Sequence, residues 1–104
     1  MTNLETSVAF ENGCACVAVS GDLDLSTAPK LWSALEPAIE QGAQTLVLDI
    51  SGVGFLDSSG ISVIVRALKI LREADRSFVV RSPQAQARKV LEVTGLIGVL
   101  TVED

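Results

Sequence analysis

A carboxylate and two hydroxyls stand next to one another in the middle of the chain, in the run Asp57-Ser58-Ser59-Gly60. An apolar segment precedes the run and a segment with helical spacing follows it, which predicts a loop between a strand and a helix. In α/β sheets, such loops collect ligand and reaction sites. Because a helix N-terminus favours negative charge, it would tolerate a phosphate on Ser58. The same residue types are also good helix caps, so capping alone is the simpler alternative.

Several other reaction chemistries are excluded by residues that the sequence lacks. Histidine is absent, which removes the Ser-His-Asp and Cys-His triads and every zinc site that uses an imidazole. No Gly-Lys-Ser or Gly-Lys-Thr sequence follows the glycines, so the phosphate-binding P-loop is missing. Ser58 also lacks the Gly-x-Ser-x-Gly elbow of esterases. We therefore expect a protein that is not an enzyme and that needs no cofactor.

A receiver domain is the main alternative, because Asp57 follows a strand-like segment and could accept a phosphate. Receivers also need an acidic pair after the first strand and a lysine near the end of the fifth. Here Lys30, Lys69 and Lys89 all fall on predicted helices, which argues against this interpretation.

The cysteines Cys14 and Cys16 are two positions apart in a predicted strand, so both should point to one face. An extended strand does not let them bond each other easily, and the sequence offers no third ligand for a metal. We expect buried thiols and no metal site.

The charge of the chain bears on its partners. Thirteen acidic and eight basic residues give a formal net charge of −5. Nucleic-acid binding that depends on neutralising phosphates is then not expected. The longest apolar candidate for a membrane span is interrupted by Ser62, Arg66 and Lys69, so we expect no membrane partner and a cytoplasmic location.

The remaining segments alternate between strand and helix patterns, which predicts an α/β fold in one domain over residues 1–104, with helices packed on a mixed β-sheet. Asn12-Gly13 between the first two apolar runs is typical of a hairpin turn. Pro37 should kink or end the first helix. Strands are expected at 7–11, 14–20, 45–50, 77–80 and 99–102, loops at 21–24 and 51–58, and helices at 27–41, 59–74 and from Ser82-Pro83 to Thr94-Gly95.

The second predicted helix has a wider apolar arc than a surface helix needs. Its additional apolar residues are Val63, Ala67, Ile70 and Ala74, which lie between the core-facing and polar stripes. They either pack beneath a neighbouring helix or form an exposed contact surface next to Ser58. The sequence leaves both possibilities open.

The run from Leu56 to Ile61, after the strand at 46–50, resembles the signature of STAS domains, and most closely that of the free-standing anti-sigma factor antagonists. Gly21-Asp22-Leu23-Asp24 is similar to the early loop of that family, and Thr94-Gly95-Leu96 to its late helix end. The resemblance covers nearly the whole chain and implies a single STAS domain. Pro37 departs from the family pattern.

The resemblance implies a phosphorylation switch. Ser58 would be phosphorylated by an ATP-binding anti-sigma factor that is also a serine kinase. The unphosphorylated domain would bind that factor and release the sigma factor, and a phosphatase would restore binding after phosphorylation. A non-catalytic subunit of a stressosome-like scaffold or of a lipid-transport complex is the alternative use. The residues expected to contact the partner are Asp22, Asp24, Asp57, Ser58, Ser59, Gly60, Val63, Ala67 and Ile70.

Overall fold

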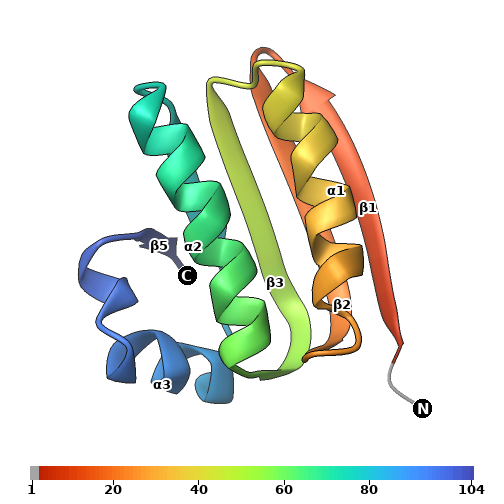
Figure 1. Ribbon diagram of the computed structural model, residues 1–104, viewed down its shortest axis with the longest axis vertical. Helices are drawn as coiled ribbons and strands as arrows, with labels where there is room; N and C mark the ends of the chain where they lie inside the picture. Colours follow the sequence, from red (N-terminus) through yellow and green to blue (C-terminus); the bar gives the residue numbers. More distant parts are fainter. Residues whose placement is uncertain (1–2) are drawn as a thin grey trace.

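Five strands and three α-helices form the fold (Figure 1), in a computed structural model that describes residues 3–104. Residues 1 and 2 of the expected domain lie outside the described part. The elements follow the order β1 (Leu4–Glu11), β2 (Cys14–Leu23), α1 (Ala28–Glu40), β3 (Thr45–Leu56), α2 (Ser58–Glu73), β4 (Ser77–Arg81), α3 (Ala85–Val93), a 3₁₀ turn (Leu96–Gly98) and β5 (Thr101–Glu103).

The strands form one mixed sheet in the order β1-β2-β3-β4-β5. β1 and β2 pair antiparallel, while β2, β3, β4 and β5 pair in parallel. The hairpin predicted at Asn12-Gly13 is confirmed, with φ angles of 50° and 79° at the two turn residues. Parallel neighbours need crossover connections, and the helices supply them. The predicted α/β fold with a mixed sheet is therefore confirmed.

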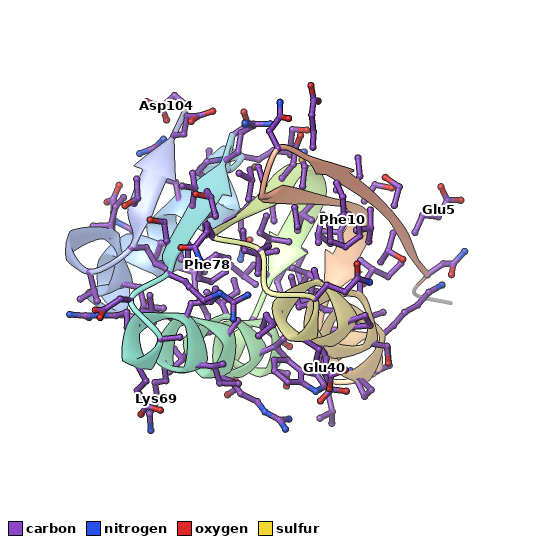
Figure 2. The ribbon with its side chains drawn as sticks, turned by 90° about the horizontal axis from the view of Figure 1, so that it is seen from above. Glu5, Phe10, Glu40, Lys69, Phe78 and Asp104 are labelled. Atoms are coloured by element: carbon purple, nitrogen blue, oxygen red, sulfur yellow. The ribbon has the colours of Figure 1, made fainter. Side chains whose placement is uncertain are left out.

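One face of the sheet carries α1 and α2. The two helices lie side by side (Figure 1), and in the view from above both are on the same side of the sheet (Figure 2). Alternate residues of β2 point into this layer, and Ala15, Val17 and Val19 are buried there. α3 lies near the end of the sheet at which α2 begins (Figure 1). The run Asp57-Ser58-Ser59-Gly60, at the start of α2, lies at the same end of the molecule.

β2 and β3 are longer than their apolar runs predict. The expected loops at 21–24 and 51–58 are largely strand, because β2 reaches Leu23 and β3 reaches Leu56. Asp22 and Leu23 pair with Phe55 and Leu56 after two register shifts in the ladder. Backbone pairing thus continues past the point where the hydrophobic alternation becomes irregular.

The first helix does not end at its internal proline. α1 continues through Pro37 to Glu40, so of the two outcomes predicted for Pro37, a kink or an early end, the early end is wrong. Pro37 cannot donate to the carbonyl of Ser33, but both residues are exposed and water can bond that carbonyl.

The third helix begins later than its capping pattern predicts. α3 starts at Ala85 with Gln84 as its N-cap, so the prediction that Ser82 caps this helix is wrong. Ser82 has a φ of 55°, and its N–H donates to the Glu103 carbonyl at 2.6 Å. Ser82 therefore belongs to the end of the β4–β5 ladder. The predicted helix end is confirmed, with Gly95 at a φ of 78°.

Candidate functional site

Asp57 is the N-cap of α2. Its φ and ψ are −119° and −171°, and its Oδ1 accepts hydrogen bonds from the backbone N–H of Ser59 at 2.8 Å and of Gly60 at 3.4 Å. A carboxylate here satisfies two helix donors and interacts favourably with the helix dipole. Of the capping residue types in the run Asp57-Ser58-Ser59, it is Asp57 that caps the helix.

Replacing Asp57 with alanine should lower the free energy of unfolding by about 1 kcal/mol, because the N-terminal donors of α2 lose their acceptor. Asp57→Asn keeps a side-chain oxygen and should cost clearly less. Urea unfolding followed by circular dichroism measures both variants. Equal stability of the wild type and Asp57→Ala would show that this cap contributes nothing.

Ser58 is the first residue of α2, and it is exposed. Its carbonyl accepts a hydrogen bond from the Ser62 hydroxyl at 3.0 Å. Its own hydroxyl has no hydrogen-bond partner within residues 3–104. An exposed hydroxyl without an internal partner can be reached by another protein's active site.

Gly60 lies against the strand ends beneath α2 and is buried. A Cβ at this position would be 2.6 Å from Leu56 Cδ1 and 3.0 Å from Leu23 Cβ. Gly60, one of the residues expected to contact the partner, is therefore covered within the domain. The glycine instead lets the first turn of α2 pack onto the ends of β2 and β3.

The acidic residues of the other expected loop lie next to the start of α2. The N–H of Asp57 donates to the Leu23 carbonyl at 3.0 Å, which joins the end of β2 to the cap of α2. Asp24 Oδ1 accepts hydrogen bonds from the backbone N–H and hydroxyl of Ser26 at 2.9 and 2.7 Å. The Asp24 carboxylate therefore shapes the entry to α1. Asp22, like Asp24, is half-buried.

The apolar flank of α2 divides between core and surface. Ala67, one of the residues expected to contact the partner, is fully buried in the hydrophobic core. Val63 is half-buried, and Ile70 is 37% exposed. α1 and α2 pack against each other on the sheet, and Ala67, in the middle of α2, is covered.

A groove between α1 and α2 begins next to the phosphate-acceptor candidate. We call it the interhelical groove; its volume is about 620 Å³. Leu25, at its α1 end, is 78% exposed. The lining combines apolar and hydroxyl side chains with one cation: Leu25, Ala28, Pro29, Trp32, Ser33, Ser59, Ser62, Val63 and Arg66.

Arg66 stacks on the aromatic side chain of the interhelical groove. Its guanidinium carbon is 4.0 Å from the Trp32 ring centroid, a cation–π contact. Trp32 Nε1 donates to Glu36 Oε2 at 3.2 Å. Within residues 3–104, the ion pairs are Arg81 with Glu103 and Arg88 with Asp104. The Arg66 cation thus has no carboxylate partner in the described chain.

The thiols lie away from this site. Cys14 and Cys16 are free and half-buried, less covered than expected, and the Cys16 sulfur is 3.9 Å from an Arg81 guanidinium nitrogen. No metal-binding group of three or more acidic, cysteine or histidine residues occurs in the described part of the chain. None of the helices within residues 3–104 is long and apolar enough to cross a membrane.

The exposed serine at a capped helix start, after a central strand of a five-stranded mixed sheet, agrees with the expected family. A family model described as "Mlab, STAS domain" matches residues 6–101. The chain belongs to the STAS domain family. The STAS resemblance of the sequence is thereby confirmed.

Several of the similar proteins are described as anti-sigma factor antagonists. An anti-sigma-B factor antagonist from Staphylococcus aureus is 28% identical over 102 residues, which are 98% of this STAS domain and 94% of the relative. The crystal structure of an anti-sigma factor antagonist from Mycobacterium paratuberculosis has a TM-score of 0.90 and 29% identity, covering 97% of this chain and 86% of that one. The phosphorylated form of SpoIIAA from Bacillus has a TM-score of 0.75 and 22% identity, covering 96% of this chain and 91% of that one. At this identity the similarity shows a shared fold.

Sequence reasoning missed the groove side chains contributed by α1 and the segment before it. These side chains are Trp32, on α1, and Leu25, in the segment before it. An isolated leucine between Asp24 and Ser26 is the signal that an apolar side chain projects from a polar turn. Nothing in the linear spacing relates Leu25 or Trp32 to Val63, because only the packing of α1 on α2 brings them together.

Proposed function

We propose that this STAS domain is an anti-sigma factor antagonist, and that phosphorylation of Ser58 switches its binding off. The supporting observation is the exposed Ser58 hydroxyl, which has no hydrogen-bond partner within residues 3–104. It lies at the start of α2, whose N-terminus is already capped by the Asp57 carboxylate. The names of its relatives support an anti-sigma factor as the partner. That function would place the protein in the cytoplasm.

In the proposed cycle the domain is a ligand and a substrate, not a catalyst. The anti-sigma factor brings ATP and Mg²⁺ to Ser58. The Ser58 oxygen attacks the γ-phosphorus, the bond to the bridging oxygen of ADP breaks, and the hydroxyl proton passes to a base of the kinase. A phosphatase then hydrolyses the phosphoester and returns the free hydroxyl.

The cap geometry explains why a phosphate on Ser58 would face outwards. Asp57 already occupies the N–H groups of Ser59 and Gly60, so these donors are not free to bind a phosphate. Phosphorylation adds about −1.5 to −2 charges next to the Asp57 carboxylate. Repulsion from that carboxylate turns the dianion towards solvent or towards a docked partner. There it remains unpaired and loses water on binding, which disfavours the complex.

The docking surface in this proposal extends from Ser58 along the interhelical groove. Val63 is common to the groove and to the expected contact residues, and Ile70 lies further along α2. An apolar side chain of the anti-sigma factor would fill the space beside Leu25 and Trp32. A carboxylate of the partner would pair with Arg66, which has no ion-pair partner within residues 3–104. Asp22 and Asp24 would border the contact on the other side of Ser58.

Leu25→Ala should weaken binding to the anti-sigma factor about tenfold, as expected for an exposed apolar side chain that becomes buried at an interface. Val93→Ala is the matched control, since Val93 is 74% exposed but lies on α3 outside the groove. Isothermal titration calorimetry compares the two variants. Equal affinities for both would remove the interhelical groove from the docking surface.

The proposed function is tested by incubating the purified domain with ATP and each anti-sigma factor of its source organism. We expect one of them to form a complex without ATP hydrolysis and to phosphorylate the domain when ATP is supplied. Peptide mapping by mass spectrometry should place the phosphate on Ser58. If no anti-sigma factor binds the domain, the antagonist function is contradicted; if one binds but modifies no serine, the switch alone is contradicted.

A further inference from the structure

The side chain of Gln86 holds both polar backbone groups of one residue. The Leu56 N–H donates to Gln86 Oε1 at 2.8 Å, and Gln86 Nε2 donates to the Leu56 carbonyl at 2.9 Å. The two bonds reproduce the pairing that a neighbouring strand would supply. They connect α3 to the last residue of β3, across 30 positions of the chain.

The contact between Gln86 and Leu56 lies in the part of β3 that has no neighbouring strand on the side of β4. β4 pairs with β3 only from Thr45 to Asp49 and ends at Arg81, whereas β3 continues to Leu56. Side chains from the start of α3 take over on this side. Gln84 Nε2 donates to the Ser51 carbonyl at 2.8 Å, and Gln86 bonds Leu56.

Hydrogen bonds on both sides of β3 hold the residues that directly precede Ser58. Towards β2, the Asp57 N–H donates to the Leu23 carbonyl at 3.0 Å. Towards α3, Gln86 holds Leu56, which is only 1% exposed. If Gln86 lost its amide, a buried N–H and C=O would lack partners and the strand end would shift to find others. Ser58 lies two residues beyond this point.

We propose that Gln86 is a positioning residue for the phosphorylation switch, an inference that rests on the proposed function. Its amide fixes the end of β3, and the rigid strand end sets where the Ser58 hydroxyl lies relative to the kinase. Phosphorylation by a second protein requires the oxygen to be aligned with the γ-phosphate, so loss of this restraint slows the reaction. Gln86 takes no part in the chemistry itself.

The test uses Gln86→Met, which keeps the length of the side chain and removes the amide, with Gln84→Met as the matched control. Amide hydrogen exchange measured by NMR on the isolated domain reports the clamp directly. We expect the Leu56 amide to exchange about tenfold faster in Gln86→Met, because it loses its acceptor. In Gln84→Met the rate should stay at the wild-type value.

The second readout is the kinetics of Ser58 phosphorylation by the anti-sigma factor that modifies the wild type. Gln86→Met should lower kcat about tenfold with KM nearly unchanged, because docking persists while alignment is lost. Measurement well below the unfolding midpoint separates this effect from global destabilisation. Unchanged Leu56 exchange, or faster exchange with unchanged kcat, overturns the positioning role alone. A wild-type domain that no anti-sigma factor phosphorylates contradicts the proposed function and, with it, this role.

Discussion

Ser58→Ala should bind the anti-sigma factor with wild-type affinity and should stay bound when ATP is added, whereas Ser58→Glu should bind about tenfold to a hundredfold more weakly. The alanine variant has no oxygen to phosphorylate. The glutamate variant places a fixed charge beside Asp57 at the start of α2, where docking would remove its water. Isothermal titration calorimetry with and without ATP measures all three proteins.

The control for added charge is Ser7→Glu, on the exposed face of the edge strand β1. It changes the net charge of the domain as Ser58→Glu does but lies outside the proposed docking surface, so its affinity should stay within about twofold of the wild type. Equal affinities for Ser58→Ala and Ser58→Glu would mean that charge at this position does not control the complex.

Gly60→Ala should destabilise the domain by about 2 kcal/mol, because the new methyl group overpacks the contact between α2 and the strand ends. The added Cβ would lie 2.6 Å from Leu56 Cδ1 and 3.3 Å from the backbone oxygen of Leu23. The Leu56 side chain can rotate only within a filled core, and the backbone oxygen cannot rotate away. The first turn of α2 must therefore lift, which also displaces Ser58.

Gly54→Ala serves as the control for this effect. Gly54 also belongs to β3, and a Cβ there would meet no atom within 4 Å. Its replacement should change stability by no more than about 0.5 kcal/mol. Urea unfolding of both variants gives the comparison, and a Gly60→Ala domain as stable as Gly54→Ala would contradict the close packing of α2 on the sheet.

The features that the sequence predicts well are local ones. Asn12-Gly13 determines its own turn because both residues adopt positive φ, and Asp57 caps α2 because its carboxylate reaches N–H groups two and three residues ahead. These interactions depend on short spacings in the chain. The boundary is less exact, because the sequence assigns Ser58 to the preceding loop whereas the structure makes it the exposed first residue of α2.

The features that the sequence does not predict arise from packing between distant segments. Periodicity along α2 places Ala67 at the edge of the apolar arc, but only the position of α1 decides that it is buried. Ser82 is a residue type that often caps helices, yet its N–H donates to the carbonyl of Glu103, which is distant in the sequence. Gln86 reads as a polar residue of a surface helix, and its role depends on where β4 ends.

The affinity of one preparation of the domain for its anti-sigma factor, measured before and after stoichiometric phosphorylation, addresses the switch without any substitution. With mass spectrometry showing a single phosphate on Ser58, the dissociation constant should rise about a hundredfold, and phosphatase treatment should return it to its first value. An unchanged dissociation constant, with Ser58 fully phosphorylated, would contradict the proposal that this hydroxyl controls the complex.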